Sequence, residues 1–489
     1  MKTTRLSALL LLTVLATSCS AVKTPSDLLR APLQDTADGT ISGIVNPFLP
    51  ANAHLTVPVQ SQSGSAIQLQ DLDQDGQDEI LAFYKTDKTD YEVNALVLSQ
   101  KDGAWKKLTT ITGVGSELDY VQFIDVTADG STDMLLGFSG GTGLSKELSV
   151  YSLKNSQLTE ILKQPYDYMV VGDITNEGKS EIALFQSSVT NDTQPGSNLQ
   201  LIDLSGGQLQ ILSSQSIDGT VIQVLFDKAS PAGSGLFVDV AIGAHSSYTA
   251  LMTWDHGAFM DKLAANDYHH LELANSKDIE LGPQHTAQAG IIGEHNMAVK
   301  DYPLYSTDIN GDGIIEVGFL VPPAGMESMA PLATPFISKY YQWDGGSKLK
   351  FKKEQFDRWG FNFHIPENWA GKYTLEVPTE SPAPWESIQF SYTNGASGEP
   401  VPLLKLRLLL KKDWNAAESK LRAEHASYKM LYEVPNTEDI TATNVVVAVL
   451  PAVEEASKLS GAALQEYQQL QLTLDEVQNL AGTPQKPIE

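Results

Sequence analysis

The chain has 489 residues, and its 60 Asp and Glu residues outnumber its 33 Lys and Arg residues to give a formal net charge of −27 at pH 7. This charge argues against nucleic acid and anionic lipid headgroups as partners, and it makes divalent cations suitable ligands. The single cysteine excludes an intrachain disulfide.

Residues 1–18 have the pattern of a secretory signal peptide. A basic start and an apolar run over 6–16, too short to span a bilayer, lead to three small residues directly before Cys19. This arrangement resembles the lipobox of bacterial lipoproteins, although Ala16 stands where that family prefers leucine. The resemblance implies cleavage before Cys19, lipid on its thiol, and anchoring to the cell membrane on the extracytoplasmic face. An ordinary secretory signal with an incidental cysteine is the alternative.

Residues 19–50 are predicted to form a lipidated tether, because the stretch after Cys19 is polar and unpatterned.

A repeat begins after the tether and predicts a mainly β fold. Its first element is a strand, an acidic turn and a strand, and its second is a hairpin with a Gly or Asn turn. Together they make one four-stranded antiparallel blade of about fifty residues, and such blades bury both faces by radial stacking. We therefore expect a β-propeller of about five to seven blades over residues 51–355, with an insertion at about 264–300. The acidic elements start at Ile67, Val121, Met169 and Leu304, a degenerate copy lies near Asp227, and the hairpins start at Leu96, Val150, Leu201, Leu251 and Tyr341.

Two acidic turns carry a complete set of oxygen ligands for a hard cation. Ca²⁺ takes about six to eight oxygens, which side chains at turn positions 1, 3, 5 and 9 help to supply, while glycine at position 6 permits the bend. The last carboxylate comes too early for an EF-hand, and the flanks are strands. The alternative is a solvated turn in which Asp, Asn and Gly simply fit the backbone. The first turn supplies Asp71, Asp73, Asp75 and Glu79, and the fourth supplies Asp308, Asn310, Asp312 and Glu316.

The second and third turns are weaker candidates for metal binding. The second has threonine at position 3, and the third has longer glutamate side chains at two positions. Their acidic residues are Asp125, Asp129 and Asp133 in the second turn, and Asp173, Glu177 and Glu181 in the third.

The repeat resembles the FG-GAP/VCBS family over roughly residues 55–355. Propellers of this family include the head of integrin α chains. The resemblance implies that the acidic residues of the first and fourth turns bind Ca²⁺. Carboxylates that fill the coordination shell leave little room for a substrate, so the expected role of the ion is structural.

Four histidines lie in the insertion, where they form either a transition-metal site or an exposed polar loop. They are His269, His270, His285 and His295. The sequence contains no HExxH, P-loop or GxSxG motif, so we predict no catalytic residue.

A small α+β domain is predicted over residues 356–482, followed by a tail over 483–489. It opens with alternating aromatic residues between Gly360 and Trp369, and Asp413 is the expected N-cap of a helix that runs to about His425. Apolar residues at helical spacing between Leu464 and Leu480 predict one closing helix. The opening run resembles a domain that follows such propellers in Gram-positive surface lipoproteins, and this resemblance implies no activity.

The sequence therefore predicts a non-catalytic binding or scaffold module, tethered to the membrane, with an unknown protein or glycan as partner. The alternative function is a polysaccharide-active enzyme or an accessory subunit of one, because the repeat also occurs beside carbohydrate-active domains.

Overall fold

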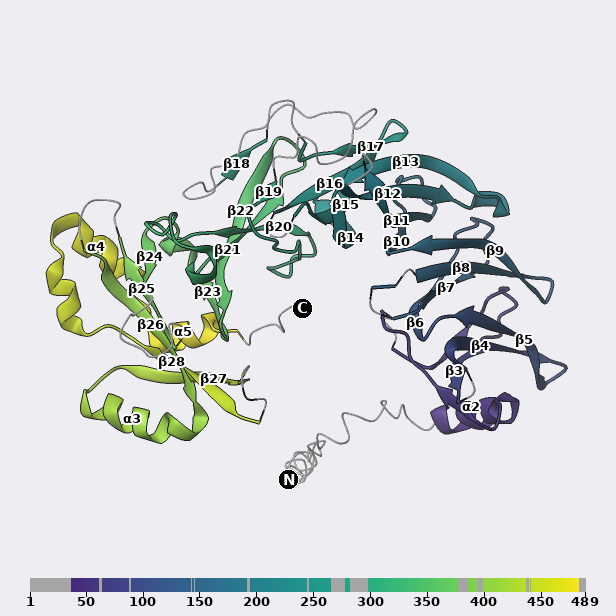
Figure 1. Ribbon diagram of the computed structural model, residues 1–489, viewed down its shortest axis with the longest axis horizontal. Helices are drawn as coiled ribbons and strands as arrows, with labels where there is room; N and C mark the ends of the chain where they lie inside the picture. The colour runs from purple at the N-terminus through teal and green to yellow at the C-terminus, as the bar shows by residue number, and fades with distance from the viewer. Residues whose placement is uncertain are drawn as a thin grey trace, which may run out of the picture.

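The computed structural model describes residues 37–482, apart from 61–63, 88, 142, 145, 191–193, 244–245, 265–277, 282–297, 377–385, 394–398, 437–438 and 440. The predicted signal peptide, Cys19, the four histidines of the insertion and the tail lie outside the described residues. Within them the chain is mainly β, as expected. Five antiparallel sheets follow one another along an arc, and a sixth sheet with its helices lies at the far end of that arc (Figure 1).

The first three sheets each order their strands from the concave side of the arc outward, and they contain the first three acidic turns. The first sheet comprises β1 (Ala53–Leu55), β2 (Ile67–Gln70), β3 (Glu79–Thr86), β4 (Thr89–Lys101) and β5 (Ala104–Val114). The second comprises β6 (Glu117–Ile124), β7 (Asp133–Ser139), β8 (Lys146–Lys154) and β9 (Gln157–Tyr166). The third comprises β10 (Tyr168–Gly172), β11 (Glu181–Thr190), β12 (Gln194–Asp203) and β13 (Gln210–Asp218).

The fourth and fifth sheets are completed by strands from the predicted insertion. The fourth comprises β14 (Thr220–Ser230), β15 (Gly233–Ala241), β16 (Ser247–Asp255), β17 (Ala258–Asp261) and β19 (Val299–Lys300). The fifth comprises β18 (Asp278–Glu280), β20 (Glu316–Val321), β21 (Ile337–Trp343), β22 (Lys348–Arg358) and β23 (Phe361–Ile365). The degenerate copy near Asp227 forms a long β14–β15 hairpin instead of an acidic turn.

Each pair of neighbouring sheets shares one apolar core. Leu81 and Phe83 of the first sheet pack in the same cluster as Leu136 and Phe138 of the second, and equivalent clusters lie between the following pairs. A strand between two such cores is buried on both faces, which explains why β3, β7 and β11 have nearly continuous apolar sequences.

Both ends of the arc are covered by other elements. At the first sheet, the helix α2 (Ala37–Val45) and the short helix η1 (Asn46–Phe48) cover the outer apolar face, and the Val45 side chain is fully buried there. At the fifth sheet, Ile337 and Phe356 belong to the core of the C-terminal domain. The closed propeller that we expected is therefore not seen, because each terminal face already has a partner. The tether predicted over 19–50 is also too long, since residues 41–49 pack against the first sheet.

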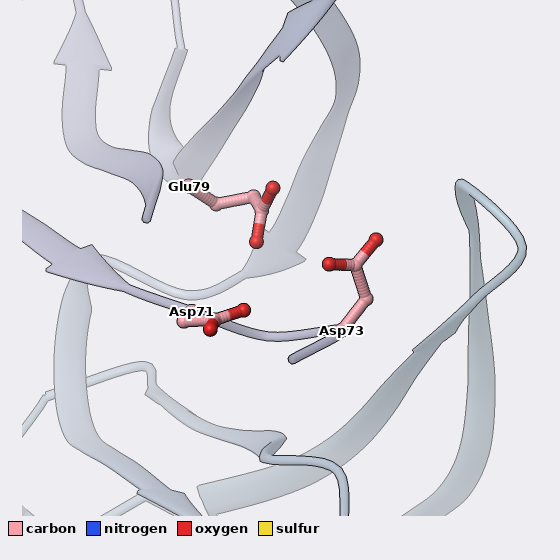
Figure 2. A group of neighbouring side chains, drawn as sticks. All are labelled: Asp71, Asp73 and Glu79. Carbon is pink, nitrogen blue, oxygen red and sulfur yellow. The ribbon is translucent and has the colours of Figure 1, made fainter. Parts of the chain in front are cut away.

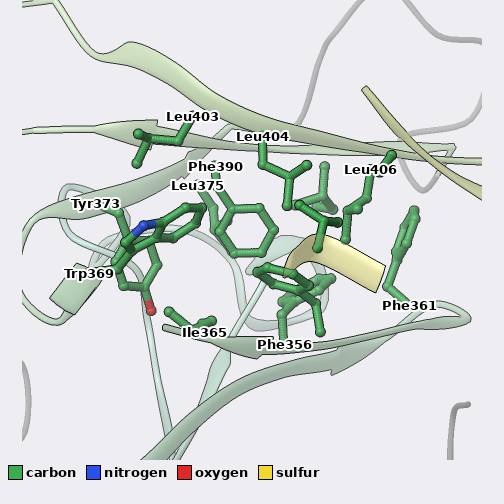
Figure 3. Packing of buried hydrophobic residues seen from close by; sticks show 14 of the residues in the cluster. Phe356, Phe361, Ile365, Trp369, Tyr373, Leu375, Phe390, Leu403, Leu404 and Leu406 are labelled. Atoms are coloured by element: carbon green, nitrogen blue, oxygen red, sulfur yellow. The ribbon is translucent and has the colours of Figure 1, made fainter. Parts of the chain in front are cut away.

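The C-terminal domain has one antiparallel sheet in the order β24-β25-β26-β28-β27, with three α-helices. Its strands are β24 (Tyr373–Glu376), β25 (Ser387–Tyr392), β26 (Val401–Leu410), β27 (Tyr428–Pro435) and β28 (Thr443–Val449). Its helices are α3 (Trp414–Ala423), α4 (Gly461–Leu470) and α5 (Leu474–Leu480). Trp369 is fully buried among Phe390, Leu375 and other apolar side chains, and its indole nitrogen donates to the Leu470 carbonyl at 2.8 Å (Figure 3).

Three details of this domain differ from the sequence-based expectations. Asp413 precedes α3, but its side chain makes no capping hydrogen bond. The single closing helix is two helices, because Thr473 and Glu476 form a capping box that starts α5. The boundary at 356 falls inside the fifth sheet, since β23 pairs with β22 along that sheet's edge.

Candidate metal centre

The four acidic loops share one backbone design. In each loop the aspartate at position 1 accepts a hydrogen bond from the amide of the glycine at position 6, at 3.0 Å for Asp71 and Gly76 and at 2.9 Å for Asp308 and Gly313. The second and third loops repeat this bond. That glycine has a positive φ in every loop, 85° at Gly76, which glycine tolerates far better than other residues. The Asp and Gly of each loop therefore account for its bend.

The acid at position 9 is buried beneath each loop. Glu79 is 4% exposed and its Oε2 accepts from the Leu72 amide at 3.0 Å. Burial, followed by the negative charges of Asp73, Asp75 and Asp71, raises the pKa of Glu79 to about 7. A buried carboxyl among other carboxylates requires either a proton or a cation to be stable.

The first loop brings three carboxylates together. Ligand oxygens of Asp71, Asp73 and Glu79 all lie within 4.8 Å of one another, and Figure 2 shows the three side chains around a common space. Asp71 Oδ1 and Asp73 Oδ1 are buried and accept no hydrogen bond within the described residues. An all-oxygen set with unsatisfied buried acceptors fits a hard cation such as Ca²⁺. The fourth predicted ligand, Asp75, is exposed, and its Oδ1 accepts a hydrogen bond from the backbone N–H of Gln77 at 2.8 Å.

The fourth loop holds its predicted ligands differently. Asp308, Asp312 and Glu316 do not form such a three-carboxylate cluster in the described part of the chain. Side-chain amides lie among them instead: Gln342 Nε2 donates to Glu316 Oε1 at 2.9 Å and to Asp312 Oδ2 at 3.2 Å. Asn310 Nδ2 likewise donates to Asp312 Oδ2 at 3.1 Å. Burial raises the pKa of Glu316 to about 7. Because side-chain amides already donate to its acids, this loop is a weaker candidate for metal binding than the first.

Lysines contact the second and third loops. Lys154 Nζ lies 2.5 Å from Asp129 Oδ2 in the second loop, and this contact lowers the pKa of the Asp129 carboxyl. Lys179 Nζ lies 2.6 Å from Asp203 and 3.4 Å from Glu177 in the third. Asp125, Asp133, Asp173 and Glu181 keep the shared backbone contacts of position 1 or position 9.

Sequence reasoning missed Gln342, Lys154 and Asp203 because they lie on the third strand of each sheet, far from the turns in sequence. The signal that could have found them is the register of each sheet. Gln342 is the cross-strand partner of Glu316, and Asp203 lies one residue past the Ile182–Ile202 pair, opposite Glu181.

No helix among the described residues is long and apolar enough to cross a membrane.

No protein-family model and no curated protein matches the chain. Among solved structures, the exotype rhamnogalacturonan lyase YesX is similar with a TM-score of 0.25 and 14% identity, over 61% of this chain and 55% of that one. The Bacillus licheniformis rhamnogalacturonan lyase PL11 is similar with a TM-score of 0.21 and 14% identity, over 58% of this chain and 60% of that one. The chain thus spans little more than half the length of either lyase, and a likeness of this size carries no information on activity or substrate.

Proposed function

We propose that this protein is a non-catalytic binding or scaffold module, anchored by lipid at Cys19 to the extracytoplasmic face of a bacterial membrane and stabilised by Ca²⁺ in its first acidic loop. The five sheets of the arc then act as blades of the FG-GAP/VCBS type that present their loops to a protein or glycan partner. The observation that carries the proposal is the convergence of Asp71, Asp73 and Glu79 around buried, unsatisfied oxygens.

The ion in this site would act on the fold. The loop joins β2 to β3, and Leu72 between two of the ligands is buried in the core that the first and second sheets share. A cation held by Asp71, Asp73 and Glu79 would neutralise their mutual repulsion and fix the Leu72 side chain in that core. Ca²⁺ therefore supports the packing of the first sheet on the second.

The anchor has its own test. Wild-type protein expressed with its native N-terminus is expected in the membrane fraction, with acyl chains on Cys19 detectable by mass spectrometry. Cys19→Ser is expected to move the protein out of that fraction. An unmodified Cys19 on a fully released wild-type protein would contradict the anchor.

The proposal of a non-catalytic role is tested against the enzymatic alternative on the mature protein with Ca²⁺ present. Incubation with a panel of wall and pectic polysaccharides, including rhamnogalacturonan, is expected to yield no new reducing ends and no unsaturated products. Glycan turnover that disappears on substitution of a single carboxylate would show the polysaccharide-active alternative to be correct. Saturable retention of one glycan class without turnover would identify the partner.

A further inference from the structure

The second acidic loop has the same backbone as the first but a different electrostatic environment. Asp125 Oδ2 accepts from the Gly130 amide at 2.9 Å, and Asp133 Oδ2 accepts from the Val126 and Thr127 amides at 3.0 Å. Asp133 is fully buried, and its Oδ1 accepts no hydrogen bond within the described residues. This loop therefore repeats the backbone design of the first loop, although its acids do not form a three-carboxylate cluster among the described residues.

A positive charge of the chain itself lies at this loop. Lys154 is the last residue of β8, and its ammonium group is 2.5 Å from Asp129 Oδ2. The hydrogen bond with Asp129 raises the pKa of Lys154, and the negative charges of Asp129, Asp133 and Asp125 raise it further. The ammonium group is thus fully charged at neutral pH and acts on all three carboxylates of the loop.

The first loop lacks this contact although a lysine is available at the same place. Lys101 ends β4 and pairs with Ala104 across its hairpin, as Lys154 ends β8 and pairs with Gln157. In the described part of the chain, no lysine or arginine forms an ion pair with Asp71, Asp73, Asp75 or Glu79. The two loops therefore differ in where their compensating charge comes from.

We propose that the Lys154 ammonium group takes the place of a metal ion in the second loop, so that Lys154 keeps Ca²⁺ out of this loop. In the third loop a lysine of the turn itself, Lys179, contacts Glu177 at 3.4 Å and Asp203 of β12 at 2.6 Å. This inference depends on the proposed Ca²⁺ site in the first loop only for the total number of Ca²⁺ ions that the chain binds. Removal of Lys154 should turn the second loop into a Ca²⁺ site.

The test uses the mature chain and Lys154→Met, which keeps an unbranched side chain of similar length and removes the ammonium group. The Lys154 side chain is 54% exposed, so the variant is expected to fold. Ca²⁺ titration by calorimetry is expected to show one more site in Lys154→Met than in the wild type. In chelator, the thermal midpoint of Lys154→Met should fall below that of the wild type, and Ca²⁺ should restore it.

Lys163→Met is the matched control. Lys163 lies on the same sheet, is 52% exposed, and pairs with Glu147 at 2.7 Å away from any acidic loop. Its removal deletes the same charge and a similar ion pair, so the control should keep the wild-type number of sites. An equal gain of Ca²⁺ binding in Lys163→Met would show a general charge effect and overturn the assignment to Lys154.

A variant that carries both Asp73→Asn and Lys154→Met separates the two claims. If the first loop is not a site, the double variant and Lys154→Met bind the same number of ions, and both have one more site than the wild type. If Lys154 has only a structural role, its removal lowers the midpoint and Ca²⁺ does not restore it. The inference is overturned if Lys154→Met and the wild type have the same number of sites and the same response to Ca²⁺.

Discussion

At the scale of single residues, the four loops share a backbone design but differ in the side chains that contact their acids. In all four loops the aspartate at position 1 accepts a hydrogen bond from the glycine N–H at position 6. The spacing of Asp and Gly in the sequence predicts this bond. What differs is the group that contacts the loop's acids: the Gln342 amide donates to Glu316 in the fourth loop, Lys154 pairs with Asp129 in the second, and Lys179 pairs with Glu177 in the third. Gln342 and Lys154 lie on neighbouring strands, so a motif confined to the turn could not reveal them, whereas Lys179 lies within the third turn itself.

The raised pKa of Glu79 predicts how the metal-free protein responds to pH. Glu79 has a pKa of about 7 in the fold and about 4.5 in the unfolded chain, so the folded state binds the proton more tightly between these values. The stability that this group contributes is complete below about pH 4.5 and is lost as the pH rises through about 7. In chelator, the free energy of unfolding should therefore fall over this range, by at most about 3 kcal/mol from Glu79.

The check is urea unfolding of the wild type and Glu79→Gln at several pH values, with and without Ca²⁺. Glu79→Gln should show a smaller decline in chelator, because its amide does not titrate. Ca²⁺ should flatten the decline in the wild type only. A wild type and a variant with the same dependence on pH would contradict the assigned pKa.

At the scale of elements, the strands were predictable and the partners of the end faces were not. The alternating and continuous apolar runs predict β3, β7 and β11, and the Asp-Gly and Asn turns predict the hairpins that close β4 and β8. The helix α2 escaped prediction because it is short and follows a polar stretch, and its stability comes from packing on the first sheet. The break between α4 and α5 was not predicted, because apolar residues keep their helical spacing across it. Thr473 and Glu476 nevertheless carry the signature of a capping box, which marks the start of a new helix.

The cover of the first sheet by α2 is tested with Val45→Ala. Val45 is fully buried against the first sheet, whereas Val453 is 87% exposed. Val45→Ala should lower the free energy of unfolding by about 2 kcal/mol, since it leaves a cavity in a packed face. Val453→Ala is the matched control and should change it by less than about 0.5 kcal/mol. Equal effects of the two substitutions would show that α2 does not cover the sheet in solution.

The start of α5 is tested with Thr473→Ala. The substitution removes the side-chain acceptor for the Glu476 amide, which lies at 3.2 Å, and should cost about 1 kcal/mol in the free energy of unfolding. Thr473→Ser keeps the acceptor and should recover most of that loss. A serine variant as unstable as the alanine variant would show that the cap contributes nothing.

At the scale of the whole molecule, the arc and the C-terminal domain share a core. Phe356 and Ile337 of the fifth sheet pack with Phe361, Trp369 and Phe390. In the fifth sheet, buried Glu354 pairs with Lys339 at 2.7 Å, and its Oε2 accepts a hydrogen bond from the Tyr373 hydroxyl at 3.0 Å. The boundary predicted at 356 therefore separates strands that belong together.

This shared core predicts the behaviour of fragments. Residues 356–489 expressed alone lack β20, β21 and most of β22, so β23 loses its partner strand and Ile337 is missing from the core. The fragment should show no cooperative thermal transition. A cooperative transition in residues 356–489 would show that this domain folds independently of the fifth sheet.

The most direct test of the account is Ca²⁺ binding by the first loop, measured by calorimetry and thermal unfolding on the wild type, Asp73→Asn and Asp78→Asn. Asp78 is an exposed acid of the same loop outside the carboxylate cluster, so its substitution makes the same change in charge. At Ca²⁺ about 100-fold above the dissociation constant, the wild type and Asp78→Asn should gain about 2.7 kcal/mol of stability, and Asp73→Asn should gain almost none. A wild type that binds no Ca²⁺, or an Asp73→Asn variant that responds like the wild type, would contradict the central claim.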